Sequence, residues 1–138
     1  MKKIIKSSVF ILVASFLAIS CDRNDENTIE SVDAIKIDSV KIAQETMDVF
    51  TVQTIKTYST YPDACHGFYT YDYIRDGLNR NVVAYAYKEN GACTSAVRVG
   101  TNGFNFRPEE KGTYTFKFWN GKDANNQNIW IEKQVVVE

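Results

Sequence analysis

The sequence predicts an all-β protein folded as a sandwich of about seven strands. From residue 31 onward it shows no helical periodicity, and its apolar residues fall in short segments rich in Val, Ile, Thr, Tyr and Phe. Turn residues separate these segments at the spacing of a β-sandwich. The expected strands are residues 34–43, 48–58, 68–75, 81–87, 94–99, 113–119 and 129–137, with a short extended piece at 104–106.

The clearest alternation lies near the C-terminus. Tyr114, Phe116 and Phe118 share one face of their strand, which we expect to face the core. The last strand carries a mostly apolar face, and we expect it to form a hairpin with this strand through residues 120–128. Turns are expected after the other strands, at Pro62-Asp63, Asp76-Gly77, Glu89-Asn90-Gly91 and Asn102-Gly103.

Residues 1–20 have the pattern of a secretory signal peptide. Three lysines and no acid lie within the first six residues, and an apolar run follows over residues 9–19. The segment Leu17-Ala18-Ile19-Ser20-Cys21 resembles the lipobox of bacterial lipoproteins, in which a peptidase cuts before a lipid-modified cysteine. This resemblance implies that the mature chain begins at a lipidated Cys21, although Ala18 replaces the usual leucine.

Lipid would then be the means of membrane attachment. The apolar run is shorter than the roughly 20 residues of a transmembrane helix. The two or three acyl chains of a bacterial lipoprotein, at about 0.8 kcal/mol per buried CH₂, give a durable anchor. We therefore expect a protein of the outer membrane, facing either the cell surface or the periplasm.

Residues 21–30 form the expected link between lipid and domain. The stretch Asp-Arg-Asn-Asp-Glu-Asn-Thr-Ile-Glu after Cys21 is acidic and nearly free of apolar residues, so it predicts a flexible linker. An acidic stretch at this place also resembles the surface-export signal of some Gram-negative lipoproteins. The sequence leaves both readings open, a signal and a solvated spacer.

The mature chain is small and acidic. Removal of Lys2, Lys3 and Lys6 with the signal leaves 13 Lys and Arg against 17 Asp and Glu, a formal net charge of −4. No basic region remains to attract nucleic acid. We expect one domain, residues 31–138, because the length suffices for a single core.

Two cysteines remain once Cys21 is assigned to lipid. In an exported protein they allow one intramolecular pairing, and we predict a disulfide between Cys65 and Cys93.

A short motif connects the predicted sandwich with a known fold. The run Glu110-Lys111-Gly112-Thr113-Tyr114-Thr115-Phe116 resembles the start of strand F in immunoglobulin-like domains, with Phe116 in place of the cysteine. The resemblance implies an immunoglobulin-like antiparallel sandwich in which Tyr114 is the tyrosine of the tyrosine corner. Residues 31–138 as a whole resemble small Ig-like lipoproteins of Gram-negative bacteria, a class that carries no implied activity.

The chain lacks a set of residues suited to catalysis or metal binding. His66 is the single histidine, and no nucleophile motif accompanies it. A closed zinc site needs four Cys or His ligands at set spacings, and the sequence has no such set. Residues 123–128 carry side-chain oxygens but one carboxylate, and we interpret them as a hairpin loop rather than a calcium site. We expect no cofactor, no metal and no enzymatic activity.

Tyrosines are the one unusual concentration. By strand parity Tyr69, Tyr71 and Tyr73 share a face, and so do Tyr85 and Tyr87 on the next strand. If these rows face solvent, they form an aromatic ladder suited to a protein or glycan partner. If they face inward, they pack the sandwich or pair across strands. Parity alone does not decide between these alternatives.

Together these features predict a lipid-anchored, non-enzymatic binding or structural module of the cell envelope. The alternative is a secreted or surface inhibitor, or a carbohydrate-binding accessory protein, that uses its tyrosine-rich strands.

Lipidation is directly testable. Replacing Cys21 with Ser removes the acylated thiol, so the protein should move from the membrane to the soluble fraction. Intact mass spectrometry of the purified protein should lose the mass of the acyl groups. An unmodified wild-type chain that begins at another residue would contradict the anchor.

Overall fold

The computed structural model describes residues 27–138, and this part of the chain contains nine strands and no helix. The expected signal, Cys21 and most of the expected linker lie outside the described residues. The strands are β1 (Ile29–Ile35), β2 (Ser39–Lys41), β3 (Thr46–Met47), β4 (Gln53–Tyr61), β5 (His66–Asp76), β6 (Asn79–Glu89), β7 (Arg98–Phe106), β8 (Gly112–Lys122) and β9 (Asn128–Val137).

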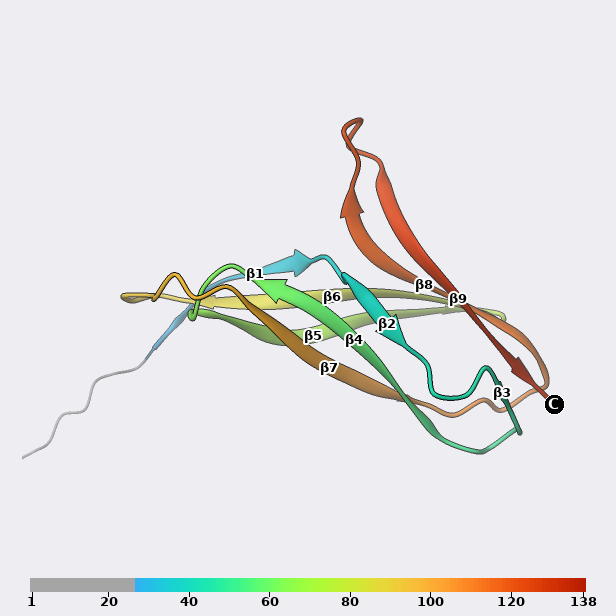
Figure 1. The fold of residues 1–138 in the computed structure, drawn as a ribbon. Helices are drawn as coiled ribbons and strands as arrows, with labels where there is room; N and C mark the ends of the chain where they lie inside the picture. Colours follow the sequence, from blue (N-terminus) through green and yellow to red (C-terminus); the bar gives the residue numbers. More distant parts are fainter. Residues whose placement is uncertain (1–26) are drawn as a thin grey trace, which may run out of the picture.

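Two sheets make up the fold (Figure 1). The larger has six strands in the order β1-β6-β8-β9-β3, with β5 paired to the other edge of β6, and the smaller has the order β2-β4-β7. The all-β, two-sheet architecture expected from the sequence is therefore confirmed. The expectation of purely antiparallel pairing is wrong, because β6 pairs with β8, and β3 with β9, in parallel.

One edge of β6 serves two partners. Its second half pairs with β1, through contacts such as Tyr85 with Ala34, and its first half pairs with β8, through contacts such as Val82 with Phe118. The two partners share one edge and so must diverge. The far end of the β8–β9 hairpin rises away from the remaining strands (Figure 1).

Side-chain alternation places the core between the sheets. In β4 the odd-numbered positions from Gln53 to Tyr61 are buried and their neighbours are largely exposed. In β8 the predicted face is confirmed, since Tyr114, Phe116 and Phe118 are all buried. Val135 and Val137 of β9 complete this wall, while Ile129 lies exposed near the hairpin tip.

Several strand boundaries differ from the sequence prediction. The expected strand 34–43 is broken into the end of β1 and the separate β2. The segment 94–97 is a loop instead of a strand start, because the Thr94 carbonyl accepts hydrogen bonds from the amides of Ala64 and Ala96.

The expected turn at Asn102-Gly103 is wrong. Both residues lie inside β7, where Gly103 pairs with Lys56 of β4. A Cβ atom at Gly103 would lie 2.9 Å from the carbonyl oxygen of Ile55, so glycine here permits close strand contact rather than a turn.

The predicted disulfide between Cys65 and Cys93 is present, with a Cα–Cα distance of 5.4 Å. It joins the loop before β5 to the loop before β7, at the end of the molecule where β1 begins. The backbone amide of Glu89 donates to the Cys65 carbonyl, and that of Asn90 donates to the Thr28 carbonyl. These contacts tie the three loops of this end together.

Loss of this disulfide should weaken the fold measurably. The bond closes a loop with a sequence separation of 28 residues, so replacing Cys65 and Cys93 together with Ala should lower the free energy of unfolding by about 2–4 kcal/mol. Urea denaturation measures this change. Reductant should destabilise the wild type and leave the double variant unaffected; equal stability of the two oxidised proteins would contradict the prediction.

Candidate functional site

A β-bulge in β5 divides the first tyrosine row. Phe68 pairs with Ala86 and Thr70 pairs with Tyr85, so Tyr69 is an extra residue in the strand. The extra residue reverses the side-chain phase. Tyr69 is 53% exposed, whereas Tyr71 and Tyr73 pack against the core. The expectation that these three tyrosines share a face is therefore wrong.

The second tyrosine row lies on the opposite side of the large sheet. In β6 the core-facing residues Val82, Ala84 and Ala86 are buried, and Tyr85 and Tyr87 alternate with them on the outer face. The Tyr87 ring covers Gly67, so closely that a Cβ atom there would collide with it. The tyrosines thus form two separate groups, and no continuous ladder connects them.

Tyr71 and Tyr73 line a cavity of about 590 Å³ between the two sheets. This volume is in the range of small-ligand pockets. The lining comes from β5, β6, β7, β8 and the β7–β8 connection: Tyr71, Tyr73, Arg75, Arg80, Phe104, Asn105, Phe106, Arg107, Glu109, Glu110 and Tyr114.

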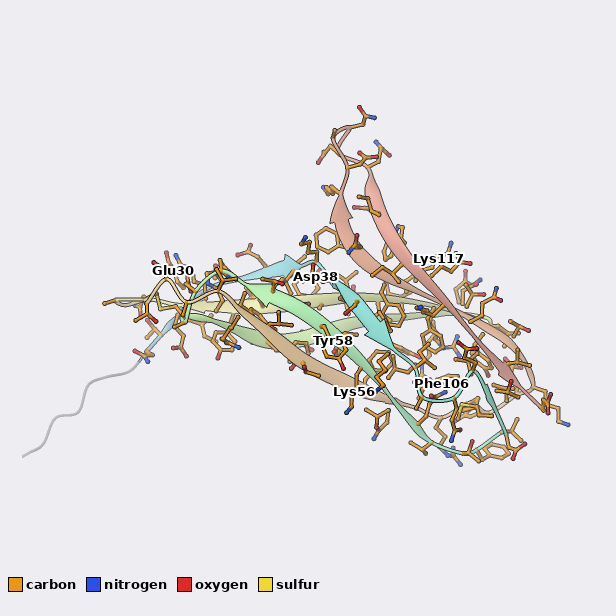
Figure 2. The ribbon with its side chains drawn as sticks, in the orientation of Figure 1. Glu30, Asp38, Lys56, Tyr58, Phe106 and Lys117 are labelled. Atoms are coloured by element: carbon orange, nitrogen blue, oxygen red, sulfur yellow. A yellow bond between two sulfur atoms is a disulfide. The ribbon has the colours of Figure 1, made fainter. Side chains whose placement is uncertain are left out.

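The cavity lies far from the chain's described start. Glu30 and Phe106 lie near opposite ends of the long axis of the molecule (Figure 2). The strand β5, with 11 residues, runs from the disulfide end to the cavity end, a distance of about 35 Å at 3.2–3.4 Å per residue.

Aromatic rings form the wall of the cavity, and Phe104 is at their centre. Its ring centroid lies 5.3 Å from that of Tyr71 and 5.3 Å from that of Tyr73, both edge to face. The Phe106 ring meets Tyr114 at 5.0 Å in the same way. The small sheet therefore supplies phenylalanines, and the large sheet supplies tyrosines.

Tyr114 is held in position by its hydroxyl. The side chain is 1% exposed, and its Oη donates a hydrogen bond to the Glu110 carbonyl at 3.1 Å. This bond spans the corner between β7 and β8, where the immunoglobulin resemblance assigns the tyrosine of the corner. The same ring forms part of the cavity wall.

Three arginines surround the aromatic wall. The Arg80 guanidinium lies 4.9 Å from the centroid of the Tyr114 ring, and that of Arg75 lies 5.6 Å from the centroid of Tyr73. Arg80 Nη1 also donates to the carbonyls of Gly77 and Asn79, at 2.6 and 2.8 Å, in the β5–β6 turn. Arg107 contacts Glu109 at 3.9 Å.

Burial changes the ionisation of two cavity tyrosines. It raises the pKa of Tyr71. The hydrogen bond between the Tyr71 hydroxyl and Thr57 Oγ1, 2.6 Å long, opposes this increase. Burial likewise raises the pKa of Tyr73, and the positive charges of Arg80 and Arg75 oppose this change. Both hydroxyls are therefore neutral at physiological pH.

His66 lies at the other end of the molecule, beside the disulfide. Its Nδ1 is 2.6 Å from Asp63 Oδ1, and this hydrogen bond lowers the pKa of Asp63. Asp63, Cys65 and Cys93 lie close together. The two sulfurs are bonded to each other, however, and so supply no thiolate to a metal or a substrate.

The loop between β8 and β9 is organised by a carboxylate. Asp123 Oδ1 accepts hydrogen bonds from the amides of Asn125 and Gln127, at 2.8 and 2.9 Å. Its oxygen is thus used in closing the hairpin, as expected for a structural loop.

The sequence reasoning missed the arginines and Phe104 of the cavity. A signal was present, because Arg75 and Arg80 flank a short turn at equal distances and must lie opposite each other in a hairpin. The two-residue connection has a positive φ at Gly77, 58°, as in a type II′ turn. The bulge that turns Tyr71 inward has no comparable signal.

Comparison with known protein families, curated proteins and solved structures finds no match to this chain. Within residues 27–138, no helix is long and apolar enough to cross a membrane.

The raised pKa values of Tyr71 and Tyr73 predict a loss of stability in alkali. Above about pH 10 the tyrosines of the unfolded chain ionise first, so the unfolded state binds fewer protons and stability falls as pH rises. Urea denaturation between pH 8 and pH 11 should show a shallower decline for Tyr73→Phe than for the wild type. Tyr69→Phe is the matched control at an exposed position, and an equally shallow decline in that variant would contradict the assignment.

Proposed function

We propose that this protein is a lipid-anchored binding module of the cell envelope, with an immunoglobulin-like sandwich and no catalytic activity. The single observation that carries the proposal is the cavity between the sheets, whose wall combines five aromatic rings with three arginines. Rings supply apolar contact area and guanidiniums supply directed hydrogen bonds, which is the composition of a ligand site.

The location of the cavity supports this function. A lipid on Cys21 would hold the disulfide end of the domain toward the membrane, since β1 begins at that end. The cavity is lined by residues beside the β5–β6 turn, and this turn lies at the end of the molecule away from the start of β1 (Figure 1), so the cavity would open toward the surroundings. A ligand could then reach it without obstruction by the bilayer, on either the surface or the periplasmic side of the outer membrane.

The chemistry of the cavity favours binding over catalysis. The hydroxyls of Tyr71 and Tyr73 are neutral, and Glu109 and Glu110 at the rim are exposed rather than buried. No histidine or cysteine lies among the lining residues. The proposal therefore contains no proton transfer and no covalent step.

The immunoglobulin-like assignment rests on particular pairings. β4 pairs with β7 in the small sheet, β8 pairs with β9 in the large one, and β3 lies parallel to β9. The Tyr114 hydrogen bond adds the corner. The parallel pairing of β6 with β8 departs from the antiparallel pairing of immunoglobulin-like domains. We therefore propose that the β5–β6 hairpin is the part of the fold that differs from an immunoglobulin-like domain.

A carbohydrate-binding accessory role is the second candidate, and one observation favours it. The cavity lining combines tyrosines with hydrogen-bond donors on the arginines and hydrogen-bond acceptors on Glu109 and Glu110. Sugars need such mixed partners for their hydroxyls. Tyr85 and Tyr87, on the outer face, remain the alternative contact surface for a partner protein.

Chemical-shift mapping tests the binding function. The ¹⁵N-labelled protein is titrated with soluble oligosaccharides and short peptides, and we expect shifts that cluster at Tyr71, Tyr73, Phe104 and Arg80. Tyr73→Phe deletes one hydroxyl at the cavity and should weaken the affinity several-fold with the fold retained. Tyr69→Phe is the control and should bind as the wild type does.

Two other outcomes of the titration would contradict binding at the cavity. Shifts confined to Tyr85 and Tyr87 would move the contact to the outer face of the large sheet. No response to any member of the panel would contradict the cavity as a binding site.

A further inference from the structure

Two arginines face each other across the β5–β6 hairpin at the cavity. Arg75 and Arg80 are direct cross-strand partners. Like charges in this relation destabilise a sheet. Among the ion pairs of residues 27–138, neither guanidinium contacts a carboxylate within 4.0 Å. The fold therefore keeps two positive charges together at the site without neutralising them.

Aromatic rings and carbonyl groups hold these guanidiniums in place. Arg80 lies over the Tyr114 ring, and two of its five N–H donors are occupied by the carbonyls of Gly77 and Asn79. Arg75 lies beside the Tyr73 ring. A guanidinium held against a ring keeps its N–H edge available, and that edge matches a carboxylate in geometry.

The acids of the cavity limit the charge of the ligand. Arg75, Arg80 and Arg107 contribute three positive charges, and Glu109 and Glu110 contribute two negative charges, which leaves one net positive charge. This balance suits a ligand group with a single negative charge and disfavours a polyphosphate. Glu109 and Glu110 can also accept hydrogen bonds from hydroxyl groups.

The apolar wall limits the shape of the ligand. Phe104, Tyr71 and Tyr73 offer ring edges and faces over a cavity of about 590 Å³. A saturated ring with hydroxyl groups at its edge and apolar C–H groups on its faces can contact both the aromatic rings and the polar groups of the cavity.

We propose that the cavity binds an acidic sugar, a pyranose unit whose carboxylate lies between Arg75 and Arg80. This inference rests on the proposed binding function and specifies its ligand class. The two guanidiniums bind the carboxylate, and the aromatic wall contacts the sugar ring. Glu109 and Glu110 accept hydrogen bonds from the sugar's hydroxyl groups.

Calorimetric titration of the full-length protein in detergent tests the inference with two matched probes. The methyl glycoside of galacturonic acid carries one carboxylate, and the methyl ester of this glycoside has the same ring and hydroxyls without the charge. We expect the acid to bind at least tenfold more tightly than the ester, and added salt to reduce this difference.

Substitutions separate the role of the arginine pair from general charge effects. Arg75 is exposed, so Arg75→Gln should fold normally and should weaken binding of the acid about fivefold to tenfold while leaving the ester unchanged. Arg75→Lys keeps the charge and loses the planar donor edge, so its affinity for the acid should lie between those of the wild type and Arg75→Gln. Lys56→Gln removes an exposed cation of β4 outside the cavity lining and should have no effect.

Each contrary result has its own meaning. Equal affinity for acid and ester, or an unaffected Arg75→Gln, would overturn the acidic-sugar inference and leave the binding cavity in place. Tighter binding of a capped dipeptide with one glutamate side chain than of the galacturonic acid glycoside would overturn it in favour of an acidic peptide. Binding of neither sugar at the cavity also overturns it, and the shift mapping then decides whether the cavity binds any ligand.

Discussion

The insertion of Phe104 between the two sheets is the contact on which the site depends. Its ring lies within 6.5 Å, centroid to centroid, of Tyr71, Tyr73, Phe116 and Phe118. Aromatic pairs of this geometry each contribute about 0.5–1.5 kcal/mol beyond the burial of their surface. Because β5 pairs with β6 alone and β7 with β4 alone, no backbone hydrogen bond joins the two strands. Side-chain packing around Phe104 therefore sets the width of the cavity.

The shared edge of β6 explains why the β8–β9 hairpin diverges from the remaining strands. The parallel contact with β8 covers only the first residues of β6, from Asn79 to Val82, and β1 takes the rest of that edge. The Ile37 amide donates to the Trp119 carbonyl, and Asn120 Nδ2 donates to the Ile37 carbonyl, where the two partners diverge. β8 and β9 thus leave the sheet beyond Phe118, whereas at the cavity end the start of β8 stays paired with β6 and contributes Tyr114 to the wall.

Local patterns predicted those parts of the fold that depend on local chemistry. The phase of β8 follows from alternation at Tyr114, Phe116 and Phe118, and the disulfide is predicted from the cysteine count together with the expectation of export. The bulge at Tyr69 could not be predicted, since inserting one residue into a strand changes its phase without changing its composition. The parallel pairing of β6 with β8 is a long-range choice, and no residue of either strand specifies it.

The consequences for the site follow from that one inserted residue. Without the bulge, and with Phe68 still paired with Ala86, Tyr71 and Tyr73 would lie on the face of Tyr85, and the sandwich would lose two rings of its wall. With it, the same strand exposes Tyr69 and directs two tyrosines to the cavity, where burial raises the pKa of their hydroxyls further above physiological pH. A neutral hydroxyl can both donate and accept a hydrogen bond. The number of tyrosines in β5 therefore matters less than the phase change, which places the uncharged hydroxyl group of Tyr73 beside two unneutralised arginines.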